Sequence, residues 1–303
     1  MMPVMEIREA PVLPLDEATA FVHDRVPLLD TGIVRTTIDP ATTEHVRFWE
    51  ARDDGALVGL AFVGRPTTFP EAWRFTYVAT RRDLTGQRLG SRLWSTARVE
   101  VDAGAEQLVT VVFDDDEPAA AAARAWGFTL QQHSVTSELD LTHIRTLASD
   151  AGDGVTFHAA DDLRFDDEDA VTAMVNASQT NPEAEVGLVG TLDGWRSAPG
   201  AGQRLVAVVA RVDGRPAAIS VAVADGDEMH VNYTGVDPSL RGRALGRRTK
   251  EFLHSHAAGL GIRLAITDNE DDNAGIRHVN EQLGYVRRSG SSWLMAPGPA
   301  AAV

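Results

Sequence analysis

The chain has 303 residues, of which 44% are hydrophobic, a formal net charge of −16 at pH 7 and no cysteine. The absence of cysteine excludes disulfide bonds, cysteine nucleophiles and thiolate metal sites, and we expect no metal. The acidic balance argues against a nucleic-acid binder, which needs a basic face, and is compatible with a cationic substrate. No apolar run is long enough to span a bilayer, and the segment Met1 to Glu9 carries acids, unlike a signal peptide. These features predict a cytoplasmic protein that binds neither nucleic acid nor membrane.

The first half of the chain shows apolar patterns typical of strands and helices in turn. Strands are predicted at 5–9, 57–63, 73–79, 108–113, 129–132 and 135–141. Helices are predicted from Asp16 onward, over 42–50, from the Gly86–Gly90 region to about 103, and from Pro118 to about 127. Asp16 is suited to cap the first of these helices.

The second half repeats this order. Strands are predicted at 155–159, 205–212, 216–224, 229–236, 263–267, 286–288 and 293–295, and helices at 167–177, 192–196, 245–258 and 273–283. Asp213-Gly214 between two apolar runs predicts a hairpin.

Two glycine-marked motifs recur at a nearly constant spacing, which indicates an internal duplication. Gly242 follows Gly86 by 156 positions (242 − 86), and Gly284 follows Gly127 by 157 (284 − 127). A small, polar stretch over 148–154 resembles a linker. We therefore predict a first domain over 1–148, a second over 154–296, and a disordered Ala/Gly/Pro-rich tail over 297–303.

The stretch that leads from the predicted strand at 229–236 into the next helix carries the strongest functional signal. Its residues are Val236, then Arg241, Gly242, Arg243, Ala244, Leu245 and Gly246. A strand that enters a helix through such a turn leaves several backbone N–H groups pointing one way, and the helix dipole adds positive charge there. The arginines add full charges and the glycines allow a close approach, so the turn suits a phosphate or pyrophosphate.

This turn resembles the acetyl-CoA loop of the GNAT acetyltransferase superfamily, although Ala244 stands where a glycine is usual. Asn273, Ala274, Gly284 and Tyr285 resemble the second GNAT signature. The resemblance implies an α/β fold of two tandem GNAT-like domains, each a mixed, mostly antiparallel sheet with helices on both faces. It also implies acetyl-CoA as co-substrate, bound by the turn and by Asn273. The two-domain layout is similar to that of mycothiol synthase, but nothing selects that substrate.

A base is needed to take a proton from an attacking amine, and an imidazole is well suited to this near neutral pH. His230 is the first candidate, and Glu228 and Glu185 are lesser ones. Glu185 lies within a segment, 181–187, that the resemblance places beside the acceptor. Strand alternation puts His230, Asn232 and Thr234 on one face, and Met229, Val231 and Tyr233 on the other. His254 and His256 are expected to have no acid–base context. Asn280 occupies the place of a tyrosine that, in many family members, protonates the leaving thiolate.

In the first half of the chain both GNAT signatures are only partly kept. Thr85 replaces the leading arginine and Arg88 the middle glycine of the first signature, and Asp116 and Ala123 replace the asparagine and the tyrosine of the second. This half is expected to have lost catalysis, and whether it binds acetyl-CoA stays open. The sequence thus predicts an N-acetyltransferase that acts on a small-molecule amine by direct transfer, as a monomer or homodimer. The alternative is a non-catalytic acyl-CoA-binding or interaction module.

Overall fold

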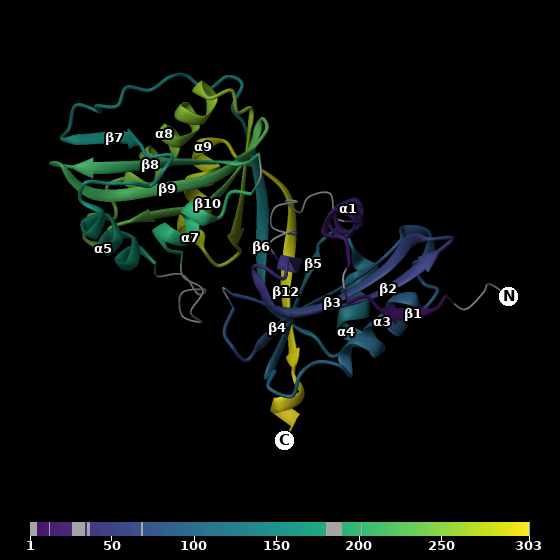
Figure 1. The fold of residues 1–303 in the computed structure, drawn as a ribbon. Coiled ribbons are helices and arrows are strands. Elements are labelled where there is room, and N and C mark those ends of the chain that lie inside the picture. The colour runs from purple at the N-terminus through teal and green to yellow at the C-terminus, as the bar shows by residue number, and fades with distance from the viewer. Residues whose placement is uncertain are drawn as a thin grey trace. The chain divides into compact units, whose positions relative to one another are not determined.

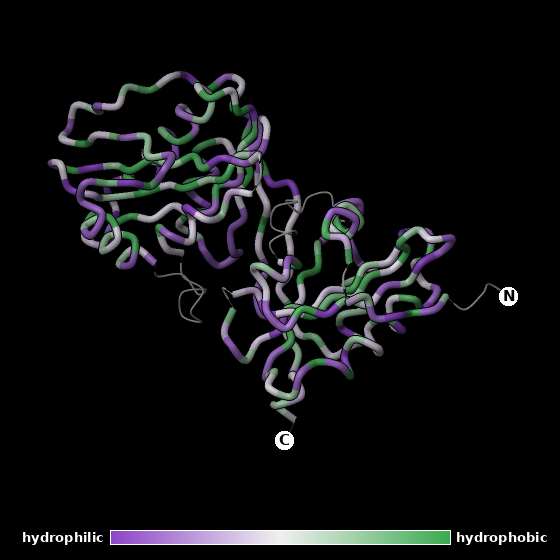
Figure 2. The backbone as a smooth tube through the Cα atoms, in the orientation of Figure 1, coloured by the Kyte–Doolittle hydropathy of each residue, from purple (hydrophilic) through white to green (hydrophobic). Residues whose placement is uncertain are grey.

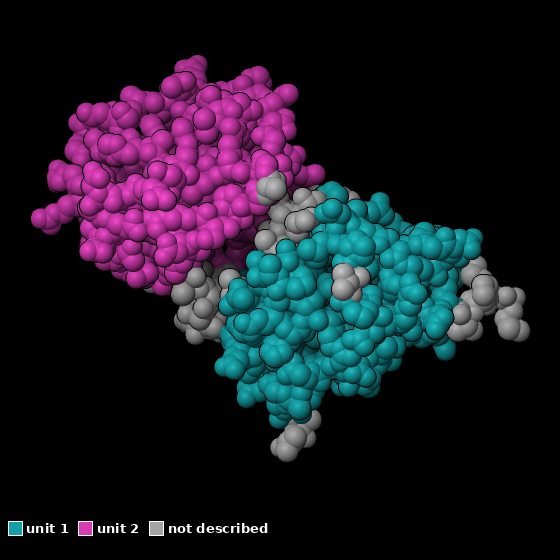
Figure 3. Space-filling model, viewed as in Figure 1, with its two compact units in different colours: residues 1–133, 291–303 teal, residues 134–290 magenta. Residues whose placement is uncertain are grey.

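The computed structural model describes residues 5–11, 13–25, 34, 37–67, 69–179, 190–200 and 202–302. Their contacts divide the chain into two compact units (Figure 3). Unit 1 comprises residues 1–133 and 291–303, and unit 2 comprises residues 134–290. No helix within the described residues has the length and apolarity needed to cross a membrane.

Unit 1 is a mixed sheet with helices on both faces. Its elements are β1 (Ile7–Glu9), α1 (Leu15–Arg25), β2 (Thr43–Asp53), β3 (Ala56–Pro66), β4 (Trp73–Thr80), η1 (Arg82–Leu84), α3 (Leu89–Arg98), β5 (Gln107–Phe113) and α4 (Glu117–Ala125), with part of β12 (Val286–Pro297). The strand order is β1-β2-β3-β4-β5-β12, and only β4 and β5 pair in parallel. α1 packs on one face and α3 with α4 on the other.

Unit 2 repeats this plan. Its elements are the second part of β6 (Thr129–Asp140), β7 (Val155–Ala159), α5 (Glu168–Ser178), α7 (Leu192–Ser197), β8 (Arg204–Val212), β9 (Arg215–Asp225), β10 (Glu228–Val236), η2 (Pro238–Leu240), α8 (Leu245–Gly259), β11 (Leu264–Glu270) and α9 (Ala274–Leu283). The strand order is β7-β8-β9-β10-β11-β6, with β10 and β11 parallel. α5 and α7 cover one face and α8 the other (Figure 1).

Burial explains why the helices lie on both faces of each sheet. β3 and β8 are buried almost continuously along their length, the pattern of strands covered on both sides. Apolar residues accordingly run along the inner strands of both sheets (Figure 2). The predicted fold class is confirmed.

The helix predicted over 42–50 is wrong, since these residues belong to strand β2. Phe48 packs in the cluster that contains α1, whereas its neighbour Trp49 packs in the cluster that contains α3. Successive residues that bury on opposite sides require the two-residue period of a strand.

Two pairs of predicted strands are each one long strand. β6 covers 129–132 and 135–141 nearly completely, and β12 covers 286–288 and 293–295. Unit 1 holds β6 up to His133 and β12 from Ser291, whereas the prediction placed one boundary at 148–154. The tail predicted to be disordered contains the turn η3 (Pro299–Ala302), because the N–H groups of Gly298 and Ala300 donate to the carbonyls of Glu106 and Ala105.

Candidate active site

The turn between β10 and α8 has two residues in the left-handed region. Gly242 has φ +79° and Ala244 has φ +57°. The Asp237 carboxylate accepts hydrogen bonds from the backbone N–H and the hydroxyl of Ser239, which fixes the start of the turn. Gly242 supplies its conformation without steric cost, whereas Ala244 holds it against the usual preference of an L-residue.

The first turn of α8 is left without a side-chain cap. The first backbone N–H groups of α8 therefore have no acceptor within the helix and can bind water or a ligand. A Cβ on Gly246 would lie 3.2 Å from Cγ2 of Val236, so the helix start is packed closely on the strand end. Arg241 and Arg243 are exposed in this turn, and Arg241 donates to the carbonyl of Ser178 at 3.2 Å. The turn is therefore built to receive an anion.

β10 and β11 are unpaired over the last six residues of β10, Val231 to Val236, which lead into this turn. Their parallel pairing covers three residue pairs and ends at His230 opposite Ile266. On its other edge, β10 has a bulge against β9 between Val231 and Tyr233, with Asn232 as the extra residue. Because the pairing with β11 ends at His230, the edge of β10 beyond it has backbone groups outside the ladder, and the bulge makes the same stretch of backbone irregular.

The bulge also changes which side chains share a face. His230 lies opposite Val223 and Tyr233 opposite Val221, and both partners border the cluster under α5 and α7. Val231 instead belongs to the cluster under α8. The prediction that Tyr233 shares a face with Val231 is wrong, because strict alternation ignores the extra residue at the bulge.

On the face with α5 and α7, polar and aromatic groups gather around Tyr233. The Tyr233 hydroxyl and the Ser178 hydroxyl lie 2.6 Å apart, and the Tyr233 ring lies 4.9 Å from that of Trp195. Burial raises the pKa of Tyr233, so it stays a neutral phenol. His230 is partly buried and has no hydrogen-bond partner among the described residues.

The segment predicted to line the acceptor pocket, with Glu185, lies outside the described residues. The residues on either side of it are held together by Gln179. Its amide nitrogen donates to the carbonyl of Gly190 and its amide oxygen accepts from the N–H of Gly190, both at 2.7 Å.

Asn273 caps α9. Its side-chain oxygen accepts from the N–H of Ile276 and its nitrogen donates to Glu270, both at 3.4 Å. These contacts are long, so Asn273 mainly sets the start of the helix. Tyr285, a further residue of the second signature, is buried in the core.

The sequence prediction missed a buried polar cluster between α8 and α9, formed by Lys250, His254, Asn269, Asn280 and Tyr285. The Lys250 amine donates to the Asn280 amide oxygen at 2.7 Å and lies 4.5 Å from the centroid of the Tyr285 ring. His254 bonds the Tyr285 hydroxyl at 2.8 Å. Burial lowers the pKa of Lys250 to about 7 and that of His254 to about 3.

One signal in the sequence pointed to this cluster. Lys250 is the single lysine in a chain that otherwise uses arginine, and an amine, unlike a guanidinium, can lose its charge on burial. The expectation that His254 and His256 have no acid–base context is wrong. His254 contacts Tyr285, and His256 lies 2.9 Å from the Asp161 carboxylate.

Unit 1 retains the turn but not the bulge. Gly86 has φ +81° and Arg88 has φ +64°, which match Gly242 and Ala244, and α3 also starts without a side-chain cap. In contrast, β4 pairs with β3 without a register shift from Phe75 to Thr80. Unit 1 therefore lacks the irregular backbone that unit 2 places beside the diverging strands.

The chain is similar in sequence and in fold to acetyltransferases. Residues 142–265 match the family model of an acetyltransferase (GNAT) domain. A tandem GNAT protein from the clavulanic acid biosynthesis pathway has a similar structure, with a TM-score of 0.71 at 20% identity over 96% of this chain and 98% of that one. A GCN5-related N-acetyltransferase from Sphaerobacter thermophilus gives 0.70 at 13% identity over 96% and 95%. No curated protein matches the sequence.

Proposed function

We propose that this chain, a tandem GNAT protein whose second unit carries the acetyltransferase domain, transfers an acetyl group from acetyl-CoA to a small-molecule amine. The observation that carries the proposal is the uncapped start of α8, which follows the part of β10 that no longer pairs with β11. A phosphorylated thioester needs both: backbone N–H groups for its phosphates and a gap that lets its acyl end reach the other face of the sheet.

Different groups in and around the turn would bind different parts of acetyl-CoA. The N–H groups of Leu245 and Gly246, with Arg241 and Arg243, would hold the phosphates. The gap between β10 and β11 would take the pantetheine arm. Asn273 would order the nearby backbone at the start of α9.

Acetyl transfer needs a base that removes a proton from the amine and a group that stabilises the negative charge on the carbonyl oxygen. The amine nitrogen attacks the thioester carbon and gives up a proton to His230, directly or through water. A backbone N–H at the bulge stabilises the oxyanion of the tetrahedral intermediate. The C–S bond then breaks and its electron pair leaves on sulfur. A thiol of pKa about 8.5 can leave without a strong acid, which suits a site where Asn280 replaces the usual tyrosine.

The acceptor would enter from the face that holds α5 and α7. Trp195 and Tyr233 present a pair of rings on that face, tilted by 32° to each other, and the net charge of −16 attracts a cation over long range. These features favour a cationic amine with an apolar portion, such as a metabolite or an antibiotic.

The test is thiol release from acetyl-CoA with a panel of amines, together with calorimetric titration of the Gly246→Glu variant. A carboxylate at this position would repel the phosphates, so we expect at least a 100-fold weaker affinity and loss of amine-dependent release. Gly259→Glu, at the other end of α8 where a Cβ would meet nothing within 4 Å, is the control for the added charge. Equal affinities of both variants would show that the turn does not hold the donor.

A non-catalytic acyl-CoA-binding module remains the second candidate. The observation that favours it is the Asn280 side chain, whose oxygen and nitrogen are both engaged, by Lys250 and Asn269. This candidate predicts binding of acetyl-CoA at the α8 turn with no amine-dependent thiol release.

A further inference from the structure

Three polar side chains form a hydrogen-bonded chain that crosses unit 2 from α8 through α9 to β11. The Lys250 amine on α8 donates to the amide oxygen of Asn280 on α9 at 2.7 Å. The amide nitrogen of Asn280 donates in turn to the amide oxygen of Asn269 on β11. Lys250 and Asn280 are 1% and 4% exposed, whereas Asn269 is only partly buried. The chain therefore leads from a buried amine to a side chain that a ligand can reach.

The charge of Lys250 sets the direction of this chain. An ammonium group donates hydrogen bonds and cannot accept them, and the position of Nζ at 4.5 Å from the centroid of the Tyr285 ring also suits a cation. A charged Lys250 therefore requires the oxygen of Asn280 to face it, which turns the NH₂ group of Asn280 toward the oxygen of Asn269. Asn269 then keeps its own NH₂ group for a partner outside these three side chains.

Asn269 lies on the part of β11 that no longer pairs with β10. The pairing ends at Ile266, and at the next residue the Thr267 hydroxyl still bridges the two strands by donating to the carbonyl of Val231 at 3.3 Å. β11 pairs with β6 without a register shift here, so Asn269 shares the face of Thr267 and Ala265. Ala265 packs in the cluster under α8. Asn269 is therefore placed beside the gap between β10 and β11, on the side of α8 and α9.

Unit 2 has an asparagine, Asn280, where a tyrosine would protonate the leaving thiolate. Both polar atoms of its side chain are engaged within the core, so Asn280 itself is not available to the sulfur. Asn269 is one hydrogen bond further toward the gap, and it presents an N–H donor. A donor that is already oriented stabilises negative charge as it develops in the transition state. An oriented amide can thus assist the departure of a thiolate without giving up a proton.

We propose that Asn269 stabilises the leaving thiolate, and that Lys250 is a positioning residue that orients the Asn269 amide through Asn280. As the amine forms its C–N bond and passes a proton to His230, the C–S bond breaks and its electron pair moves to sulfur. The Asn269 NH₂ group donates a hydrogen bond to that sulfur, and the thiolate takes a proton from water after release. This inference rests on the function proposed for unit 2.

The first experiment compares two leaving groups in single-turnover acetyl transfer. The donors are acetyl-CoA and its selenoester analogue, whose selenolate is a weaker base than a thiolate and needs less stabilisation. We expect Lys250→Met to slow transfer from the thioester by at least about 10-fold and from the selenoester by less than about 3-fold. The affinity for acetyl-CoA, measured by calorimetry, should change by less than about 2-fold.

The control is Glu251→Gln, which changes a charge on the next residue of α8, whose side chain is 42% exposed. Both rates should stay unchanged in this variant. Equal losses with the two donors in Lys250→Met would indicate a general structural effect and overturn the inference, as would no loss with either, while the proposed function would stand. No thiol release by the parent with any amine would refute the function and the inference together.

Asn269→Asp tests the end of the chain that faces the gap. The carboxylate can still accept from Asn280, but it offers an oxygen in place of the NH₂ group. We expect it to slow transfer from the thioester at least as much as Lys250→Met does. Adding Lys250→Met to it should bring little further loss, because both changes remove the same hydrogen bond to sulfur. Losses that add fully would show that the two residues act independently.

The dependence on pH tests the role of the proton on Lys250. Burial lowers the pKa of Lys250 to about 7, and above it the neutral amine can also accept, so the direction of the chain is no longer forced. Besides Asn280, the side chains that face the amine are His254 from α8 and Tyr285 from the start of β12's segment. Burial lowers the pKa of His254 to about 3 and raises that of Tyr285, so both stay neutral near pH 7.

The measured quantity is the ratio of the thioester rates of the parent and Lys250→Met. The titrations of the amine and of His230 affect both proteins and cancel in this ratio. We expect the ratio to fall as the pH rises from 6 to 9, because the parent loses the ammonium group that orients Asn269. A ratio that is constant over this range would show that the proton on Lys250 does not orient the amide.

Discussion

The amine nitrogen of Lys250 lies 2.7 Å from the amide oxygen of Asn280, inside a core where the lysine is only 1% exposed. Burial alone lowers the pKa of Lys250 to about 7. α8 carries the proposed phosphate turn and α9 begins at Asn273, so the two helices that flank the donor site are joined through an amine that can lose its charge near neutral pH.

Replacing Lys250 by Met should change how stability depends on pH. Between about pH 7 and 10 the unfolded chain keeps a proton on this amine and the folded chain does not. The parent therefore gains stability as pH rises, by up to about 1.4 kcal/mol per pH unit. Below about pH 7 the amine is charged in both states and the cost of burying it is complete. Urea unfolding at pH 6.5, 7.5, 8.5 and 9.5 should show a flatter profile for Lys250→Met, with its largest stability gain at pH 6.5.

The neighbours of Lys250 titrate outside this window. The pKa of His254 is about 3, and burial raises the pKa of Tyr285 above its ordinary value. Arg247→Met, on the same helix, is the control and should keep the slope of the parent. If the free energy of unfolding changed equally with pH in the parent, Lys250→Met and Arg247→Met, Lys250 would keep its proton in the folded state.

Replacing His230 by Ala should slow acetyl transfer by roughly 100-fold or more, as expected for loss of a general base. The affinity for acetyl-CoA should hardly change, because His230 lies on the face with α5 and α7 and not in the turn. The measurement is kcat against pH with a reactive amine. His256→Ala, which removes a partly buried histidine paired with Asp161, should leave the rate unchanged. An unchanged pH profile in His230→Ala would exclude it as the base.

Replacing Gly235 by Ala should destabilise unit 2, since the new Cβ would lie 2.5 Å from the hydroxyls of Ser178 and Tyr233. We expect a cost of about 1–3 kcal/mol from the displaced side chains. The same change at Gly259, where a Cβ meets nothing, should stabilise by about 0.5–1 kcal/mol. Thermal and urea unfolding of Gly235→Ala and Gly259→Ala measure both effects. We expect the free energy of unfolding to fall in the first variant and to rise in the second. A neutral Gly235→Ala would show that the contact between α5 and β10 is loose.

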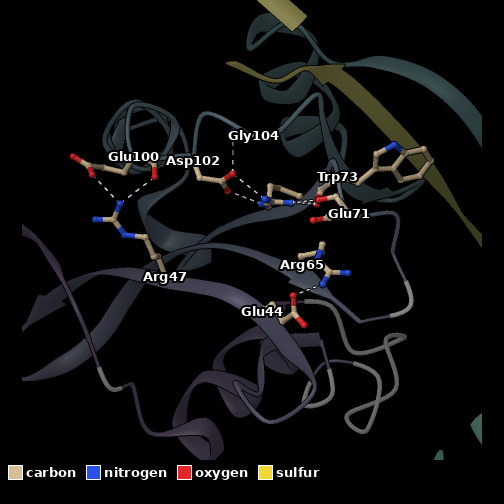
Figure 4. Close-up of polar contacts among 9 residues, drawn as sticks. Glu44, Arg47, Arg65, Glu71, Trp73, Glu100, Asp102 and Gly104 are labelled. Atoms are coloured by element: carbon tan, nitrogen blue, oxygen red, sulfur yellow. Dashed lines mark hydrogen bonds and ion pairs between the residues drawn. The ribbon is translucent and has the colours of Figure 1, made fainter. Parts of the chain in front are cut away.

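Replacing Arg74 by Met should cost about 3 kcal/mol, since it leaves several acceptors without a donor. Arg74 is 3% exposed, binds both carboxylate oxygens of Asp102 at 2.6 and 2.8 Å, and donates to the carbonyls of Glu71 and Trp73. Figure 4 shows Asp102 and the nearby pair of Arg47 with Glu100, which is more exposed. Arg47→Met should therefore cost less than about 1 kcal/mol. Similar decreases in the free energy of unfolding of Arg74→Met and Arg47→Met, measured with urea, would contradict this difference.

The sequence predicted most elements because their patterns are local. The hairpin at Asp213-Gly214 and the helix that begins at Leu245 are present as expected. The helix expected at 42–50 failed because β2 is buried on both sides, which hides the alternation of a strand. β6 and β12 were each divided in two because their polar middle residues resemble turns, whereas pairing with distant strands keeps them extended.

For the site, the turn from Arg241 to Gly246 could be found because glycine and arginine carry its chemistry in the sequence itself. The bulge at Asn232 could not, because the extra residue is defined only by the register against β9. The same holds for the contact of Lys250 with Asn280, which lie 30 positions apart. The assignment of Glu185 stays a prediction.

The return of the chain to unit 1 at Ser291 has a consequence for synthesis. Unit 2 is continuous, from Ser134 to Gly290, whereas unit 1 needs residues 291–297 to pair with β5. During synthesis unit 1 therefore cannot complete its sheet until residues 291–297 have been made. The edge of β5 stays unpaired until then. The half encoded second can close its sheet earlier, so translation order and folding order are reversed. Loss of the residues from Ser291 onward would damage the first unit and spare the second.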